Sequence, residues 1–225
     1  MEFERLEYLI GKDKLNILKN KKVLVLGLGG VGGSVVNALV RSGLGNITIV
    51  DYDKIDITNI NRQLEAFHST VGEYKTEVLK RIILDINPNC NIKTINELID
   101  KNNINLLFQD KYDYIIDCCD TMDTKKLVIK RSLNDKIPFI TSMGTANKLD
   151  ALKLEITTLN KTFNDPIARI LRKWAKDEKL NQSKIKVLTS KEVPIKNKKL
   201  GSNSFVPPTA GILIANYVFL ELIKK

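Results

Sequence analysis

A glycine-rich segment near the N-terminus has the residue types and the spacing of a phosphate-binding loop. It follows the apolar run 23–26, leads into a helix-like segment at 34–41, and contains Gly27, Gly29, Gly30 and Gly32. Glycine lets the backbone approach an anion closely, and a helix N-terminus offers free N–H groups and a positive dipole end. Asp51 ends the next apolar run, where a ribose-binding carboxylate is expected. The pattern predicts an adenine nucleotide, bound either as a redox cofactor or as a reactant.

Further polar residues follow at positions that suit triphosphate chemistry. They are Asp53, Asn59, Arg62, Gln63, Lys75 and Asp120. Arg62 and Lys75 can neutralise phosphate charge as it redistributes in a transition state. Asp120 follows the fourth apolar run, at the strand end where such sheets bind ligands, and a carboxylate there can hold Mg²⁺ on the phosphates. A hydride-transfer domain has no need of the two cations, so the pattern favours a nucleotide that reacts.

Each of these residues also has an ordinary structural interpretation. Asp51 could cap a turn and Arg62 could form a surface ion pair. Lys75 could lie in the solvated first turn of a helix, and Asp120 could cap the helix that follows it. The joint spacing of the residues, and no single one of them, therefore supports the interpretation.

The order of segments predicts an α/β fold, with a doubly wound, mostly parallel Rossmann-like sheet and a C-terminal strand and helix extension. Strands are expected at 23–27, 47–51, 91–95, 114–118, 139–143 and 152–156, and helices at 32–42, 75–87 and 125–134. A further helix begins at Asp165-Pro166, and a polar, lysine-rich loop is expected at 179–203. The apolar stretch 209–223 predicts a buried closing helix, with a membrane anchor as the alternative.

We expect one domain over residues 1–225. Its parts are an N-terminal helical arm (1–20), a nucleotide-binding core (21–145), and a basic C-terminal extension with the closing helix (146–225). The acidic start, Met1 to Arg5, is not typical of a secretory signal, so a cytoplasmic location is expected.

Positive charge is concentrated in one segment of the chain. The net charge is +10, and residues 161–199 carry 12 basic and 4 acidic groups. The helix expected after Pro166 has Ile167, Ile170, Leu171 and Trp174 at the spacing of a buried side, and carries Arg169, Arg172, Lys173 and Lys176 on its other side. The segment predicts either a surface that binds a polyanion such as RNA, or a solvated lysine-rich face.

Cysteine and histidine usage disfavours several kinds of site. Cys90, Cys118 and Cys119 form no C-x-x-C pair, and His68 is the single histidine of the sequence. We therefore expect no disulfide framework, no four-cysteine zinc site and no histidine base. Cys118 and Cys119 are expected to be buried as small apolar residues in a strand.

Over nearly its whole length, the chain resembles the ThiF/MoeB/HesA family of adenylating enzymes, which is related to the ubiquitin-activating enzymes. Within that family it is most similar to the tRNA threonylcarbamoyladenosine dehydratases, on segments 3–11, 42–46, 86–88, 164–166 and 201–207. The more specific of these are Asn164-Asp-Pro166 and Gly201-Ser-Asn-Ser-Phe-Val-Pro207.

The resemblance implies that the chain binds ATP and Mg²⁺. Gly29 and Gly30 would line the phosphates, Asp51 would bind the ribose with Asp53 beside it, and Asp120 would hold the magnesium. The triphosphate would be contacted by Asn59, Arg62, Gln63 and Lys75. The resemblance also implies a homodimer in which Arg5 reaches into the partner subunit's ATP site. The implied catalytic residues are thus Arg5, Arg62, Lys75 and Asp120.

The implied activity is the ATP-dependent cyclisation of N6-threonylcarbamoyladenosine beside the tRNA anticodon, by adenylation of its carboxylate and intramolecular attack. The chain lacks the paired C-x-x-C zinc ligands usual in sulfur-carrier adenylases, and has no cysteine between Thr145 and Lys199 for a thioester. The alternatives are an adenylyltransferase acting on a sulfur-carrier or ubiquitin-like protein, an NAD(P)-binding oxidoreductase, and a non-catalytic scaffold that binds nucleotide and tRNA. Sulfur-relay partner proteins and the subset of tRNAs are not specified by the sequence.

Overall fold

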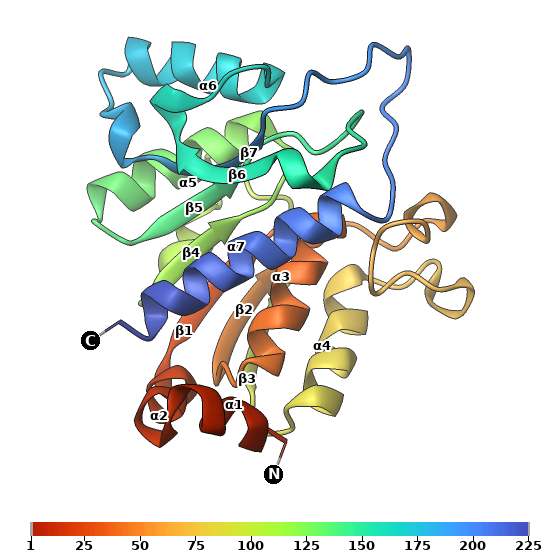
Figure 1. Cartoon of the computed structure of the whole chain (residues 1–225), viewed down its shortest axis with the longest axis vertical. Helices are drawn as coiled ribbons and strands as arrows, with labels where there is room; N and C mark the ends of the chain where they lie inside the picture. Colours follow the sequence, from red (N-terminus) through yellow and green to blue (C-terminus); the bar gives the residue numbers. More distant parts are fainter. Residues whose placement is uncertain (1, 225) are drawn as a thin grey trace.

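The computed structural model describes residues 2–224 as a seven-stranded sheet with helices on both faces (Figure 1). The strands are β1 Lys22–Leu26, β2 Asn46–Val50, β3 Asn91–Ile95, β4 Tyr114–Asp117, β5 Phe139–Ser142, β6 Leu154–Thr158 and β7 Lys186–Ser190. Their order in the sheet is β3-β2-β1-β4-β5-β7-β6, and all neighbours are parallel except β6 and β7. The first five positions of this order have the strand arrangement of a dinucleotide-binding sheet.

Seven α-helices connect or flank the described strands. They are α1 Glu4–Ile10, α2 Lys12–Asn20, α3 Gly30–Arg41, α4 Lys75–Ile86, α5 Met122–Asn134, α6 Pro166–Asp177 and α7 Val206–Leu222. Helices α3, α4 and α7 pack on one face of the sheet, and α5 and α6 pack on the other. In Figure 1, α1 and α2 lie at the end of the molecule opposite α6.

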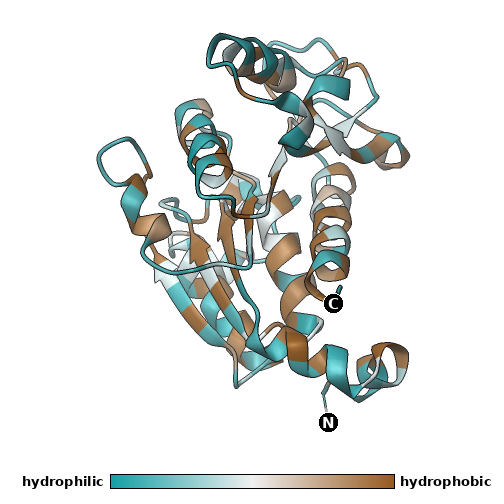
Figure 2. Ribbon diagram, turned by 90° about the vertical axis from the view of Figure 1, so that its left-hand side faces the viewer, coloured by the Kyte–Doolittle hydropathy of each residue, from teal (hydrophilic) through white to brown (hydrophobic). Residues whose placement is uncertain are grey.

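The central strands divide their side chains between two apolar cores. Along β1, Val23 and Val25 join the core under α3 and α7, whereas Leu24 and Leu26 join the core under α5 and α6. Successive side chains of a strand point to opposite faces, so an uninterrupted apolar run such as this one is buried on both sides. Figure 2 shows the apolar residues gathered on the strands and on the helical turns that face them.

Helix α7 crosses α3 at very short range because position 211 is glycine. A Cβ atom on Gly211 would lie 2.3 Å from the carbonyl oxygen of Val31 and 2.7 Å from the Cβ of Ser34. No larger residue fits there without separating the helices. The crossing buries one side of the closing helix predicted at 209–223, whereas Ile212 and Leu220 on its other side are exposed. No helix among the described residues is both long and apolar enough to cross a bilayer.

Most of the predicted elements are present with shifts of one to three residues. The strand at 91–95 is β3 itself, and Asp165 caps α6 by accepting a hydrogen bond from the backbone N–H of Ala168 at 3.0 Å. The strand predicted at 152–156 begins two residues later, as β6, because a 3₁₀ turn occupies Ala151–Lys153. The helical arm predicted at 1–20 corresponds to α1 and α2, with Met1 outside the described residues.

Two predictions about the C-terminal extension are wrong. The segment 179–203 is not a continuous loop, because it contains β7, which pairs with both β5 and β6 and fully buries Val187 and Leu188. In α6 the buried side is formed by Ala168, Leu171 and Ala175, whereas Ile170 is exposed. Small alanines permit close packing there, and a count of large apolar residues overlooks them.

Candidate functional site

A cavity of about 880 Å³ lies at the carboxyl ends of the parallel strands. Leu26, the last residue of β1, is in register with Val50 of β2 on one side and with Asp117 of β4 on the other. The residues that follow these strands therefore meet at one edge of the sheet. The connections of β1 and β4 leave in opposite directions along the sheet, and such switch points are where open α/β sheets bind ligands.

The glycine loop runs along the floor of this cavity. Gly27 has a left-handed φ of +82°, and a Cβ on it would lie 2.6 Å from the backbone nitrogen of Cys119. Gly29 and Gly30 line the cavity, as predicted for a phosphate-binding loop. Gly32 lies behind the loop, where a Cβ would come within 1.8 Å of the Gly27 carbonyl oxygen. Gly32 therefore permits the close approach of α3 to β1 and does not itself face the cavity.

Two carboxylates hold the cavity's buried lysine. Lys75 Nζ lies 2.8 Å from Asp53 Oδ2 and 3.9 Å from Asp51 Oδ2, and Lys75 is only 5% exposed. Asp51 accepts hydrogen bonds from the backbone N–H groups of Leu28 and Asp53, while burial raises the pKa of its carboxyl group. The alternative of a solvated Lys75 is thus wrong, whereas Asp51 both braces the turn and lines the cavity.

The segment after β2 supplies the polar wall beside Lys75. Arg62 donates to the carbonyl oxygen of Thr58 and to Asn61 Oδ1, both at 2.9 Å, so the predicted alternative of a surface ion pair is not what this side chain forms. Asn59 and Gln63 are buried and line the cavity with Arg62. The Oε1 atom of Gln63 is buried without a hydrogen-bond partner among the described residues. A buried acceptor without a donor is costly, so this wall is poised to contact a ligand.

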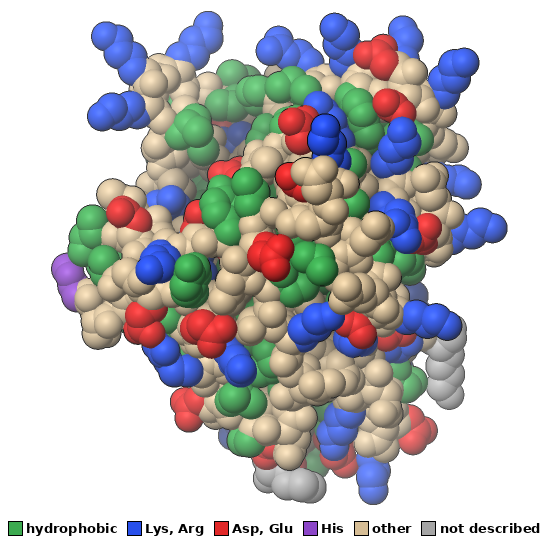
Figure 3. All heavy atoms as spheres, turned by 180° about the vertical axis from the view of Figure 1, so that it is seen from behind, with side chains coloured by type: hydrophobic (Ala, Val, Ile, Leu, Met, Phe, Trp, Pro, Cys, Tyr) green, Lys and Arg blue, Asp and Glu red, His purple; other side chains and the backbone are tan. Residues whose placement is uncertain are grey.

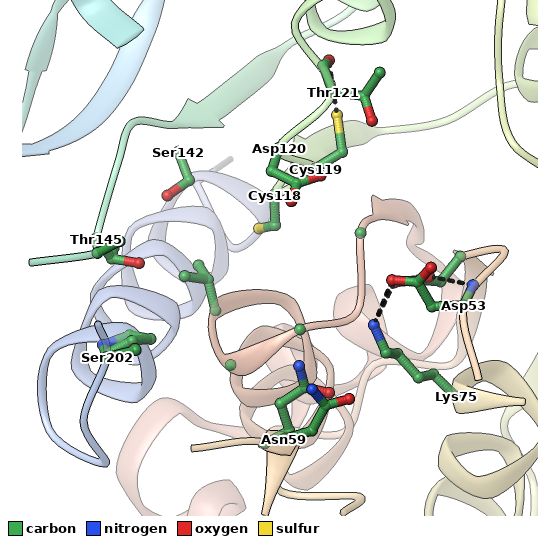
Figure 4. Close-up of a pocket in the computed structure, with 18 of the residues that line it drawn as sticks. Asp53, Asn59, Lys75, Cys118, Cys119, Asp120, Thr121, Ser142, Thr145 and Ser202 are labelled. Atoms are coloured by element: carbon green, nitrogen blue, oxygen red, sulfur yellow. Dashed lines mark hydrogen bonds and ion pairs between the residues drawn. The ribbon is translucent and has the colours of Figure 1, made fainter. Parts of the chain in front are cut away.

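Asp120 lines the cavity from the end of β4 with an exposed carboxylate (Figure 4). The N-cap residue of α5 is Thr121, so the alternative of Asp120 as that helix cap is wrong. The backbone before Asp120 is anchored by a buried pair: Lys125 Nζ donates to Asp117 Oδ2 at 2.6 Å and to Thr141 Oγ1 at 2.9 Å. Asp117 also accepts from the Cys119 N–H at 3.1 Å, which orients the loop that presents Asp120.

Cys118 and Cys119 reach the cavity, but neither is set up as a nucleophile. Burial raises the pKa of both thiols well above the ordinary value, and the Asp117 carboxylate adds to the effect. Burial also raises the pKa of Cys90, to about 11. The thiolate is the reactive form of cysteine, so these side chains act as small apolar residues near neutral pH. The prediction that Cys118 and Cys119 are buried within a strand is wrong, because both are only partly buried and follow β4, which ends at Asp117.

The cavity has a second half that the sequence analysis missed. Its hydroxyl groups belong to Ser142, Thr145 and Ser202, which lie across the cavity from Lys75 and Asp53 in Figure 4. Its apolar lining comes from Met143, Ile167, Leu200 and Pro207. Ser202 and Pro207 belong to the segment 201–207 that the sequence singled out, although without a role in the site. The other residues come from the end of β5, the first turn of α6 and the loops beside them, and no local motif marks them. The cavity thus joins a charged compartment to one of mixed polarity.

The nucleotide and the metal fit the charged compartment differently. The glycine loop, the side-chain amide N–H groups of Gln63 beside it and the Lys75 cation are groups that can bind a triphosphate. Within residues 2–224, no group of three or more His, Cys, Asp or Glu side chains is arranged to hold a metal ion. A Mg²⁺ ion at Asp120 would therefore take most of its ligands from phosphate oxygens and water, as this ion commonly does.

Other predicted residues lie outside the cavity. Arg5 is exposed on α1, at the end of the molecule opposite α6 (Figure 1), so it does not reach the cavity of its own chain. Arg169, Lys173 and Lys176 are exposed on α6, but Arg172 is partly buried and donates to the Thr162 carbonyl oxygen at 2.8 Å. Many Lys and Arg side chains line the upper edge of the molecule in Figure 3, which is the α6 end.

Comparison with known proteins agrees with this geometry. Residues 4–225 match the model of the ThiF family. The chain is 39% identical over 242 residues to the tRNA threonylcarbamoyladenosine dehydratase of Bacillus subtilis, covering 99% of this chain and 95% of that protein. The chain belongs to the ThiF family.

The structure of this ThiF-family chain is similar to solved structures of relatives with bound nucleotide. The tRNA N6-threonylcarbamoyladenosine dehydratase of E. coli, TcdA, in complex with AMP superposes with a TM-score of 0.94 at 29% identity, covering 99% of this chain and 94% of that one. The ATP complex of the same protein gives a TM-score of 0.94 at 29% identity, with 99% and 93% coverage. The α/β fold with a mostly parallel sheet is therefore that of nucleotide-binding members of the family.

One buried residue of this ThiF-family site was not anticipated from the sequence. Glu65 is fully buried and neither carboxylate oxygen has a hydrogen-bond partner among the described residues. It lies behind the glycine loop, where a Cβ on Gly33 would come within 2.8 Å of its Oε2. Burial raises the pKa of Glu65 to about 8, against the opposing effect of Lys75 and Arg62. Leu64 and Phe67 in the same segment are exposed while Glu65 is buried, which inverts the usual hydrophobic pattern at these positions.

Replacing Glu65 should change how stability depends on pH. The folded state keeps a proton that the unfolded chain releases near pH 4.5, so stability falls as the pH rises from there towards 8. In Glu65→Gln that loss is absent. The unfolding free energy of the variant, relative to that of the parent, should therefore rise by on the order of 3 kcal/mol between about pH 5 and pH 7.5. Urea unfolding at the two pH values measures the difference. Parallel pH profiles of the two proteins would show that Glu65 is not protonated in the folded state.

Proposed function

We propose that this protein is an ATP-dependent tRNA threonylcarbamoyladenosine dehydratase. The observation that carries the proposal is the two-part cavity in a chain that matches nucleotide-bound TcdA over 99% of its length. The charged compartment suits ATP, and the compartment of Ser142, Thr145 and Ser202 suits a polar acceptor beside it. The protonated thiols of Cys118 and Cys119 support a route without an enzyme thioester.

The reaction needs no nucleophile from the enzyme. A carboxylate oxygen of the threonyl group attacks the α-phosphorus of ATP, an O–P bond forms, and pyrophosphate leaves. The neighbouring carbamoyl group then attacks the activated carbonyl carbon, loses a proton, and displaces AMP. Ring closure joins two groups of one molecule, so the effective concentration of the attacking group is high. The enzyme contributes position and charge stabilisation.

The side chains divide these tasks between them. Gly29 and Gly30 approach the phosphates with their backbone, and Asp51 accepts the ribose hydroxyl groups with Asp53 beside it. Lys75 and Arg62 neutralise the phosphate charge, with Asn59 and Gln63 as further hydrogen-bonding partners. Asp120 holds Mg²⁺, which, when bound, offsets charge on the phosphate oxygens. Because Lys75 is paired with Asp53 at 2.8 Å, triphosphate binding must compete with that carboxylate.

We also propose an oligomeric state and a tRNA-binding surface for the protein. We propose a homodimer in which Arg5 of one copy completes the cavity of the other, because Arg5 is exposed and far from its own cavity. A tRNA substrate suits a cytoplasmic enzyme and a basic docking surface on α6. Arg169, Lys173 and Lys176 are the proposed contacts, and Arg172 supports the helix from below through Thr162.

Loss of the Asp120 carboxylate should remove most of the activity. The assay incubates the protein with ATP, Mg²⁺ and tRNA that carries threonylcarbamoyladenosine, and measures loss of one water by nucleoside mass spectrometry. Asp120→Asn should lower kcat on the order of 10²–10³-fold, because a neutral amide holds Mg²⁺ poorly. Asp123→Asn is the matched control, with a 91% exposed side chain on the first turn of α5. No water loss with the parent protein would overturn the proposed function, and an unchanged Asp120→Asn rate would overturn the role of Asp120.

Charge reversal on α6 should weaken tRNA binding without affecting ATP. Phosphate contacts release counterions, and each contributes roughly 0.9 to the slope of log affinity against log salt. Lys173→Glu with Lys176→Glu should raise the tRNA dissociation constant and flatten its salt dependence across roughly 50–200 mM. The same reversal at Lys12 and Lys19 on α2 serves as the control. Equal effects of the two double variants would mean that α6 is only a solvated face.

Mixing two inactive variants should restore activity if the cavity is shared between copies. Arg5→Ala and Lys75→Ala each damage every site of their own homodimer, but a mixed dimer has one site with both groups intact. Random exchange should recover about a quarter of the parent rate. Native mass spectrometry confirms that mixed dimers have formed. Mixed dimers without recovered activity would show that Arg5 does not act across the interface.

A further inference from the structure

A buried ion pair connects the cavity to the basic surface. Lys148 Nζ lies 2.9 Å from Asp165 Oδ2, and the two side chains are 1% and 0% exposed. Lys148 Nζ also donates to the carbonyl oxygen of Gly144. Two buried charges are costly to desolvate, and separating them would leave each charge buried without its partner, so the two side chains stay together. Here it fixes the segment 144–148, whose residues Gly144, Thr145 and Ala146 line the cavity.

Asp165 attaches this segment to the start of α6. Its second oxygen, Oδ1, accepts the backbone N–H of Ala168 at 3.0 Å and so caps the helix. The next residues bring α6 to the cavity, because Ile167 in its first turn is a lining residue. A Cβ on Gly144 would lie 3.5 Å from both Asp165 Oδ2 and Ile167 Cδ1, so segment and helix are in van der Waals contact. The exposed lysines of α6 thus stand on the helix whose first turn forms a cavity wall.

The same segment holds the second basic element. Asn147 forms backbone hydrogen bonds within the 191–200 stretch and at the residue that follows it: Ile195 N–H donates to its carbonyl oxygen at 2.8 Å, and its own N–H donates to the Gly201 carbonyl oxygen at 2.8 Å. Its side chain accepts the Gly201 N–H at 2.6 Å. That stretch carries Lys191, Lys196, Lys198 and Lys199. Both lysine-bearing elements are therefore anchored on residues 144–148.

We propose that Lys148 and Asp165 are positioning residues. They keep tRNA that is bound on α6 and on residues 191–200 aligned with the part of the cavity lined by Ser142, Thr145 and Ser202. This inference rests on the proposed function, since it concerns how the tRNA substrate is aligned. Neither side chain contacts the reacting atoms. Their effect is to make the docking surface and the wall formed by Gly144, Thr145 and Ile167 move as one unit. A misplacement of about 1 Å between bound substrate and reacting groups can cost on the order of 10²-fold in rate.

The test removes both charges and keeps the helix cap. In Lys148→Met with Asp165→Asn, the asparagine can still cap α6 and the net charge of the protein is unchanged. The matched control is Lys130→Met with Glu178→Gln, a pair that also links α6 to its neighbours, 2.7 Å apart at the far end of the helix with 49% and 39% exposed side chains. Thermal melting followed by circular dichroism shows whether each variant is folded, and calorimetry shows whether it binds ATP. Only variants that do both are compared.

At saturating ATP and threonylcarbamoyl-bearing tRNA, the cavity-side double variant should lose about 10- to 100-fold in kcat. Its dissociation constants for ATP and tRNA should change less than about threefold, and the control pair should retain the parent rate. A purely structural role would lower the melting temperature and leave kcat per folded molecule unchanged, which would overturn the inference.

A second measurement does not depend on turnover. Hydrogen–deuterium exchange should show that tRNA slows exchange of the backbone amides of residues 144–148 in the parent and in the control, but not in the cavity-side variant. Equal protection in all three proteins would overturn the inference. A parent that binds tRNA with this protection but never cyclises it would refute the proposed function and leave the coupling supported.

Discussion

The site depends on how closely the first turn of α3 lies against the ends of β1 and β4. Gly27 has a positive φ, and a Cβ atom on it would lie 2.6 Å from the backbone nitrogen of Cys119. A Cβ atom on Gly32 would lie 1.8 Å from the Gly27 carbonyl oxygen. Because both positions lack a side chain, the N-terminus of α3 opens directly onto the cavity. The same closeness leaves Cys118 and Cys119 partly buried beside Asp117, and desolvation together with that carboxylate raises the pKa of both thiols. A single steric condition thus opens the N-terminus of α3 onto the cavity and keeps the two thiols protonated near neutral pH.

Two buried lysines at the site, Lys75 and Lys125, are paired with carboxylates before any ligand binds. Lys75 is held by Asp53 and Asp51, and Lys125 is held by Asp117 and Thr141. The first pair faces the cavity and can exchange a carboxylate for a phosphate, whereas the second is sealed in the core and orients the loop of Asp120. Glu65 is the exception, because its carboxyl group is buried without a hydrogen-bond partner among the described residues and stays protonated to about pH 8. Its protonation avoids placing a third negative charge behind the phosphate loop.

The sequence predicts those features that depend on residues close to one another in the chain. The glycine loop, Asp51 and the Asp165-Pro166 helix start depend on neighbouring residues, and the structure has them where the sequence indicated. Strand β7 was missed because its apolar residues are surrounded by lysines, and its burial comes from pairing with β5 and β6. Glu65 was missed for the opposite reason: nothing local distinguishes a buried carboxylate between two exposed apolar side chains. Ser142, Thr145 and Ser202 converge only through the topology of the sheet.

The crossing of α7 over α3 has a consequence for synthesis of the chain. Residues 30–41 emerge from the ribosome well before the helix that covers them, at 206–222. β7 likewise enters the sheet between β5 and β6 only after both have been made. Contacts between distant parts of a chain form slowly, and apolar surface left uncovered in the meantime promotes aggregation. In the nascent protein, the side of α3 that packs on α7 therefore stays uncovered until residues 206–222 have been made.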